Sequence, residues 1–222
     1  MLVKMPGDIN GIDFMIKDLE NCTVMLLDHT AQITVDRCKN TKFYIGPIKA
    51  SIFFRDCSDC EITVSCSQFR CRDLTNSKLW LYTPNDPIVE SSSDLIFAPY
   101  NFKYPLLRQH VDKAELIGEF TDDDGVVQKK VNKWSQIYDF TKREDDALNF
   151  KLLDPSEFKI INCNSVNDKL QMNDDVTDEE KDYLYELNVD YGGSLSNEVV
   201  KAADSLMTFD IKTGAKAAQE AF

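Results

Sequence analysis

A unit of 17 to 19 residues repeats five times along the first hundred residues of this chain. The five segments begin at Ile16, Val35, Phe54, Cys71 and Ile88. Within each segment, apolar columns recur at a spacing of two positions, which is the side-chain period of a β-strand. Helical repeats usually exceed 30 residues, so this short period predicts a coil of short strands. We therefore expect an all-β fold, a right-handed parallel β-helix of about five coils.

The columns of the repeat predict which residues face the core and which form turns. The two apolar columns are Val24, Phe43, Ile62, Leu79 and Ile96, then Leu26, Ile45, Val64, Leu81 and Ala98. A small polar column precedes them and contains Asn21, Asn40, Asp59, Asn76 and Ser93. Such side chains tolerate left-handed backbone and hydrogen-bond to their own main chain, so we expect this column to occupy tight turns.

The seven cysteines favour core packing over metal binding. Four of them lie close together in the sequence, Cys57, Cys60, Cys66 and Cys71. Zinc is one interpretation of a Cys-x-x-Cys pair, but a zinc site usually needs a second spaced pair or histidines, and the chain has only His29 and His110. Because the cysteines share repeat columns with Leu, Thr and Ser, we predict free thiols in a reducing compartment and no metal site.

Charge and composition limit the classes of partner. The formal net charge is −13, which argues against nucleic acid and anionic membranes. No run of 18 apolar residues is present, and residues 1–6 resemble neither a signal peptide nor a myristoylation signal. We expect a cytoplasmic protein without a membrane anchor.

Two regions are expected. Residues 1–153 form the β-helix and its closing cap, in which Trp134, Ile137 and Phe140 at spacings of three predict an apolar cap. Residues 154–222 form an acidic extension, partly helical or disordered. Capping signals predict helices over 181–187 and 197–208, which dock on the coils or on another protein.

One arginine interrupts the pattern of the outward-facing residues. Strand alternation in the fourth segment directs Phe69 and Cys71 to the core and Gln68, Arg70 and Arg72 to solvent. The residues that precede the five segments are Met15, Thr34, Phe53, Arg70 and Pro87, so Arg70 is the only charge in this column and lies beside Phe53. An exposed guanidinium suits a carboxylate or phosphate of a partner, whereas the alternative is an ion pair with Glu90 or another neighbouring acid.

Several motifs together resemble the tubulin-folding cofactor C domain family, and its retinitis pigmentosa branch in particular. They are Asp18–Cys22, Gly46–Cys57, Gln68–Arg70, Pro87–Ser93 and Trp134–Phe140. The resemblance covers about residues 5–153 and implies a right-handed parallel β-helix that acts as a GTPase-activating protein. The implied partner is an Arf-like small GTPase of the cilium or, in the other branch, tubulin.

The resemblance also implies residue roles. The family's arginine finger falls on Arg70, its neighbouring glutamine on Gln68 and its interface glutamate on Glu90. We expect Phe53, Phe69 and Arg72 to contact the same partner. Relatives often carry a second glutamine where this chain has Ser67. GTP and Mg²⁺ would belong to the partner, since this chain lacks a phosphate-binding Gly-x-x-x-x-Gly-Lys-Ser/Thr loop and needs no cofactor of its own.

Two other functions remain open from the sequence. One is a non-catalytic structural component of the cilium, axoneme or microtubule cytoskeleton, which binds axonemal or cytoskeletal proteins through the rigid coil and residues 154–222. The other is an actin-monomer binder similar to the related β-helix of cyclase-associated proteins. Both the GTPase activator and the structural component would act at the cilium, basal body or microtubule cytoskeleton.

Overall fold

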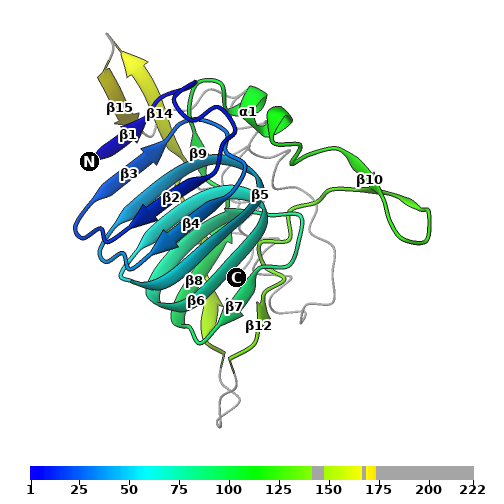
Figure 1. Cartoon of the computed structure of the whole chain (residues 1–222). Helices are drawn as coiled ribbons and strands as arrows, with labels where there is room; N and C mark the ends of the chain where they lie inside the picture. Colours follow the sequence, from blue (N-terminus) through cyan, green and yellow to red (C-terminus); the bar gives the residue numbers. More distant parts are fainter. Residues whose placement is uncertain (142–147, 167–168, 174–222) are drawn as a thin grey trace.

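The structure is a computed structural model that describes residues 1–141, 148–166 and 169–173 (Figure 1). Its elements are β1 (Leu2–Lys4), β2 (Phe14–Lys17), β3 (Thr23–Leu26), β4 (Ile33–Asp36), β5 (Lys42–Ser58), β6 (Glu61–Tyr82), β7 (Ile88–Glu90), β8 (Ser93–Pro99), β9 (Phe102–Lys103), α1 (Leu107–Lys113), β10 (Glu119–Thr121), β11 (Val127–Lys129), β12 (Tyr138–Asp139), β13 (Phe150–Leu152), η1 (Pro155–Glu157), β14 (Ile161–Val166) and β15 (Lys169–Asn173).

Successive coils stack as a parallel β-solenoid of about five turns, which confirms the predicted architecture. Figure 1 shows the coils following one another in sequence order, from the blue strands at the upper left to the green strands lower in the picture. One row of strands runs β2–β4–β5–β6–β7 and the other runs β1–β3–β5–β6–β8, all paired in parallel. β5 and β6 belong to both rows because each continues around a corner of its coil. After the last coil, β12 pairs with β7 and β13 pairs with β8, so both rows gain a further strand.

The register confirms four of the five predicted segments and corrects the last one. Ile16, Val35, Phe54 and Cys71 lie opposite one another, as expected. Cys71, however, pairs with Val89 rather than with Ile88, and Leu79 pairs with Phe97 rather than with Ile96.

The error of one residue has a simple cause. Ile88 is followed by Val89, and Leu95 to Phe97 is a continuous apolar run, so alternation at period two is compatible with either register. The structure buries Val89, Leu95 and Phe97 completely and leaves Ile88 and Ile96 partly exposed. Ile88 therefore replaces Pro87 in the outward column that contains Arg70.

The corners of the coils are made by residues in the left-handed backbone conformation. Two stacked columns have φ between 45° and 58°: Asp18, Arg37, Asp56, Asp73 and Ser91, then Asn21, Asn40, Asp59, Asn76 and Asp94. The predicted Asn/Asp turn column is thus confirmed in four coils, and Asp94 replaces Ser93 in the fifth. Amide side chains link neighbouring turns, since Nδ2 of Asn40 donates to Asn21 and Nδ2 of Asn76 donates to Asp59.

The interior is filled by the apolar columns and by cysteines. Phe54 packs edge-on against Phe43 at 5.4 Å between ring centroids and is tilted against Phe69 at 6.0 Å. All seven cysteines are free thiols, and the six other than Cys22 are buried, which confirms the predicted packing role for those six. Burial raises the pKa of the Cys60 thiol to about 11, so this cysteine is protonated and unreactive at neutral pH.

A buried carboxylate holds the N-terminal turn against the first coil. Oδ2 of Asp28 accepts hydrogen bonds from the backbone N–H groups of Gly7, Ile9 and Asn10 at 2.7–3.0 Å. Burial opposes ionisation of this group most strongly, but the combined backbone hydrogen bonds outweigh it and lower the pKa of Asp28 to about 2. Asp28 is therefore a carboxylate at neutral pH.

The predicted apolar cap is correct for two of its three residues. Trp134 is completely buried and Ile137 is half-buried against the core. Phe140 is 56% exposed, so its assignment to the cap was wrong. The spacing of three residues is helical, whereas this segment is extended and pairs through β12 with β7. Alternation along an extended chain puts Phe140 on the same outward side as Tyr138.

The chain continues along the β-helix beyond residue 153. β14 pairs in parallel with β9 and antiparallel with β15, and Phe158 and Ile160 belong to the same buried core as the coils. The division at 153/154 stays a prediction, but the first part of the expected extension packs on the coils. The helices expected over 181–187 and 197–208 lie outside the described residues. No helix in the described part of the chain is long and apolar enough to cross a membrane.

The turn columns generate a test that separates backbone conformation from side-chain bonding. Asn76 has a φ of 45° and its side chain bonds Asp59 at 2.7 Å. We expect Asn76→Ala to lower the free energy of unfolding by about 1–2 kcal/mol, because alanine is strained in the left-handed region. Asn76→Gly also removes the amide but has no such strain, so it should be the milder variant in urea unfolding. Equal losses would contradict the conformational explanation.

Candidate functional site

Parallel register aligns a row of outward-facing side chains across four neighbouring strands. Phe53 of β5, Arg70 of β6, Ile88 of β7 and Tyr138 of β12 lie opposite one another. We call these four residues the Arg70 row. Their chain neighbours Phe54, Cys71 and Val89 fill the core, and alternation along each strand therefore turns the row toward solvent. The stack fixes the backbone under every member of the row.

Arg70 is exposed and its guanidinium lies 5.5 Å from the centre of the Phe53 ring. No described residue forms a hydrogen bond or ion pair with this guanidinium. The alternative in which Arg70 pairs with Glu90 is thus not seen, because the register puts Glu90 opposite Arg72 instead. The cation is held over an aromatic face and retains its hydrogen-bond donors for an external group.

A second arginine contacts the same ring but is already paired. The guanidinium of Arg55 lies 5.5 Å from the Phe53 ring centre and donates two hydrogen bonds of 2.6 Å to the carboxylate of Asp36. These bonds raise the pKa of Arg55 above its usual value. Phe53 therefore packs between one neutralised guanidinium and the unpaired guanidinium of Arg70.

Gln68 is held in place by its own chain. Its Nε2 donates to the carbonyl oxygens of Asp86 at 2.9 Å and Phe69 at 3.2 Å. The carbonyl of Ser67, which precedes it, accepts hydrogen bonds from Thr83 and Asn85. These contacts tie β6 to the turn before β7 and fix the amide of Gln68 two residues from Arg70.

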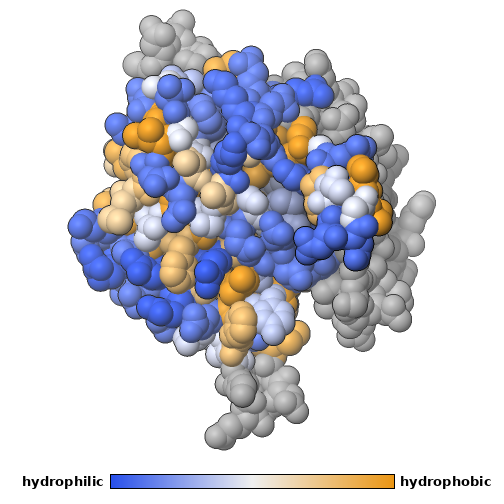
Figure 2. All heavy atoms as spheres, turned by 45° about the vertical axis from the view of Figure 1, so that its right-hand side comes forward, coloured by the Kyte–Doolittle hydropathy of each residue, from blue (hydrophilic) through white to orange (hydrophobic). Residues whose placement is uncertain are grey.

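A hollow of about 430 Å³ opens beside Gln68 and Ile88. It is lined by Gln68, Asn85, Asp86, Ile88, Lys133, Tyr138 and Phe140. Tyr138 and Phe140 are each 56% exposed and their rings meet edge-on at 4.6 Å. Figure 2 shows hydrophobic spheres gathered low on a mostly hydrophilic face, where Figure 1 places β12. A group of exposed aromatic side chains beside an unpaired arginine is typical of a protein-binding surface.

Sequence reasoning missed Tyr138, Phe140 and Lys133 as members of this surface. The spacing of three residues in 134–140 predicts Phe140 in the core and gives Tyr138 no role. A period of two would have put Tyr138 and Phe140 together on one side. Only the pairing of β12 with β7 brings Tyr138 and Phe140 beside Ile88, one strand away from Arg70.

The remaining predicted site residues divide into exposed and buried. Arg72 is exposed, with Nε 3.5 Å from the carboxylate of Asp73, and Glu90 is exposed on the neighbouring strand. Phe69 is completely buried, so the prediction that it contacts a partner is corrected. Its side chain faces the core like that of Cys71 and supports the strand from within.

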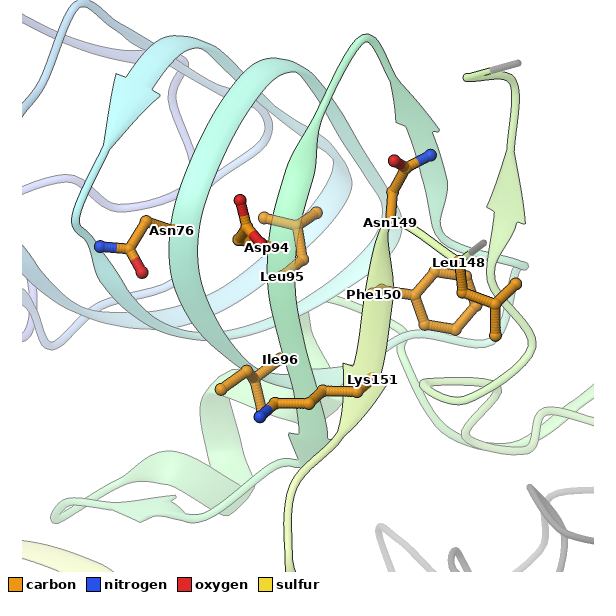
Figure 3. Close-up of a pocket in the computed structure, with 8 residues that line it drawn as sticks. All are labelled: Asn76, Asp94, Leu95, Ile96, Leu148, Asn149, Phe150 and Lys151. Atoms are coloured by element: carbon orange, nitrogen blue, oxygen red, sulfur yellow. The ribbon is translucent and has the colours of Figure 1, made fainter. Parts of the chain in front are cut away.

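A second hollow of about 370 Å³ lies on the other row of strands and is lined by residues of the paired strands β8 and β13 and of the turns before them (Figure 3). Asp94, Ile96 and Lys151 are among its lining residues, and none of the Arg70 row contributes to it. The Arg70 row and this hollow are therefore separate features of the molecule.

Comparison with known proteins identifies the family of this chain. The model of the family described as Tubulin binding cofactor C matches residues 11–140. The chain belongs to this family. Protein XRP2 of Danio rerio is 41% identical over 138 residues, covering 62% of this chain and 34% of that protein. Protein XRP2 of Homo sapiens is 39% identical over 150 residues, covering 68% of this chain and 39% of that protein.

Tubulin-specific chaperone C of Homo sapiens is 30% identical over 162 residues, covering 72% of this chain and 44% of that protein. The chain thus spans less than half the length of these relatives. In this member of the tubulin binding cofactor C family, the matched region 11–140 contains every residue of the Arg70 row.

Two ion pairs in adjacent coils allow a test of how burial changes the contribution of an ion pair to the stability of the fold. Asp36 is 10% exposed in its side chain and pairs with Arg55, whereas Asp18 makes the same two-bond contact with Arg37 but is 58% exposed. We expect Asp36→Asn to lower the free energy of unfolding by about 1–2 kcal/mol, because it unpairs a shielded hydrogen-bonded group. Asp18→Asn should leave stability almost unchanged. Chemical denaturation measures both, and equal effects would contradict the dependence on burial.

Proposed function

We propose that this chain is a GTPase-activating protein for an Arf-like small GTPase and supplies Arg70 as an arginine finger. The observation that carries the proposal is the exposed guanidinium of Arg70, which has no ion pair among the described residues and lies on a stacked strand beside Phe53. Family membership supports it, since the resemblance puts the family's finger at this position.

The exposed position of Arg70 allows its guanidinium to stabilise charge in the active site of a partner. A guanidinium inserted in trans neutralises the charge that develops on the transferred phosphoryl group, while GTP, Mg²⁺ and the attacking water belong to the GTPase. Mounting the finger on a strand with paired neighbours on both sides reduces the conformational entropy lost on binding. Gln68, Arg72, Glu90 and the exposed aromatic pair Tyr138 and Phe140 would surround the finger at the interface.

Tubulin is the second candidate partner. The relatives named tubulin-specific chaperone C support this candidate. Both candidates place the protein in the cytoplasm, at the cilium, basal body or microtubule cytoskeleton. The non-catalytic scaffold remains the alternative function, with axonemal or cytoskeletal proteins bound through the coil and residues 154–222.

The decisive experiment is single-turnover GTP hydrolysis by an Arf-like GTPase with and without this protein. We expect stimulation of about 10³–10⁵-fold by the wild type and its loss with Arg70→Ala, because the finger supplies most of the stabilising charge. Arg37→Ala is the matched control, since it removes an exposed arginine from an earlier coil and should leave stimulation intact. The same assay with tubulin tests the second partner.

No stimulation of either substrate by the wild type would reject the catalytic function and favour the scaffold. Stimulation that survives Arg70→Ala would also reject it, because the finger would then be elsewhere. Binding of the GTP-loaded partner without faster hydrolysis would make the protein a reader of the GTP state rather than an activator.

Phe53 generates a separate prediction about positioning. If its ring holds the guanidinium of Arg70, Phe53→Leu should reduce the maximal stimulated rate about 2- to 5-fold, which corresponds to a cation–π contact of about 0.5–1 kcal/mol. The half-saturating concentration should change less than the maximal rate. A change confined to the half-saturating concentration would show that Phe53 acts only as a partner contact.

A further inference from the structure

The two histidines of the chain meet at one point of the fold, although 80 residues separate them in the sequence. His29 follows Asp28 at a corner of an early coil, and His110 lies on α1, which Figure 1 shows beside the upper coils. Their ring centroids are 5.6 Å apart. Among the residues that the structure describes, Asp28, His29 and His110 are the one group of three whose ligand atoms, all within 4.8 Å of one another, could hold a metal ion.

The distances fit a tetrahedral ion. Nδ1 of His29 lies 3.2 Å from Oδ1 of Asp28, and Nε2 of His110 lies 3.6 Å from the same oxygen. Ligand atoms at zinc–nitrogen and zinc–oxygen distances of about 2.0–2.2 Å stand roughly 3.4 Å apart in a tetrahedron. The 3.6 Å separation is too long for a hydrogen bond, so Nε2 of His110 and Oδ1 of Asp28 face each other without a direct hydrogen bond.

The surrounding residues orient these side chains in the manner of a metal site. Nδ1 of His110 is 2.8 Å from the hydroxyl of Tyr104, which leaves Nε2 directed at Asp28. Oδ2 of Asp28 accepts from the three N–H groups of the N-terminal turn. Oδ1 faces both histidines, accepts the backbone N–H of His29 at 2.9 Å and lies within hydrogen-bond distance of the His29 ring. Partners of this kind fix ligand geometry in known metal centres.

The three residues are shielded from bulk solvent but not sealed off from it. Asp28 and His110 are almost completely buried, while the side chain of His29 is 15% exposed and offers a path from solvent. A Cβ at Gly11 would lie 3.0 Å from Nε2 of His29, and one at Gly46 would lie 2.7 Å from the Tyr104 hydroxyl. Both glycines therefore leave room for the histidine ring and for its neighbouring support.

We propose that Asp28, His29 and His110 form a site for one divalent transition-metal ion of the zinc class. Two imidazoles and one carboxylate are the ligands that zinc prefers, and water or another small ligand would complete the coordination. The bound ion would join α1, the early coil and, through Asp28, the N-terminal turn. The site lies apart from the Arg70 row and shares no residue with it.

The test uses the full chain without a histidine tag, stripped of metal with EDTA. Zn²⁺ binding is measured by competition with a chromophoric chelator, and Co²⁺ is added as a spectroscopic probe. We expect one equivalent to bind in the low micromolar range or tighter, with Co²⁺ bands of nitrogen and oxygen ligation, and a raised melting temperature that EDTA reverses.

Three variants make the test specific. His29→Gln removes a partly exposed ligand and should weaken Zn²⁺ binding at least about 10-fold. Tyr104→Phe keeps the ring but removes the hydroxyl beside His110, and should weaken binding about 10-fold. Cys22→Ser removes the most accessible thiol and should change nothing. Circular dichroism of the metal-free variants confirms that they remain folded.

Three outcomes would overturn the proposal. The first is wild-type protein that binds no Zn²⁺ in the micromolar range. The second is equal affinity in the wild type and His29→Gln. The third is a Co²⁺ spectrum with thiolate charge-transfer bands, which would assign the metal to cysteines instead.

Discussion

The structure depends on the in-register stacking of like residues from one coil to the next. Each coil bonds its backbone to the coils above and below, so a corner that turns in one coil must turn at the same place in all of them. The two columns of left-handed residues satisfy this condition, and Asn or Asp supplies many of their positions because these residues tolerate that conformation. The inward columns then fill the interior with apolar side chains and thiols.

The same stacking creates the exposed surface. Once Phe54, Cys71 and Val89 are buried, their chain neighbours must face solvent, and register sets Phe53, Arg70 and Ile88 side by side. The pairing of Arg55 with Asp36 matters here because it neutralises one of the two guanidiniums on Phe53. Arg70 is left as the cation that an outside partner can use. The rigid stack of strands thus presents the unpaired guanidinium of Arg70 against the ring of Phe53.

The opposite corner of the molecule applies the same principle to different chemistry. Asp28 draws the N-terminal turn onto the coils through three backbone hydrogen bonds, and α1 brings His110 to the same carboxylate. The Arg70 row and the cluster around Asp28 each combine residues of the repeat with residues from the part of the chain that follows the repeat. Tyr138 plays this part at the Arg70 row, and His110 and Tyr104 play it beside Asp28.

The sequence by itself determined the solenoid, its turns and the outward direction of Gln68, Arg70 and Arg72, because each follows from a local period. Tertiary structure decided what period could not. Adjacent apolar residues at 88–89 and 95–97 left the last register ambiguous, and burial of Val89 and Phe97 resolved it. Contacts between distant segments put Tyr138 beside Ile88 in the Arg70 row and His110 beside His29. No local pattern encodes such contacts, since they depend on where the chain returns to the coils after residue 100.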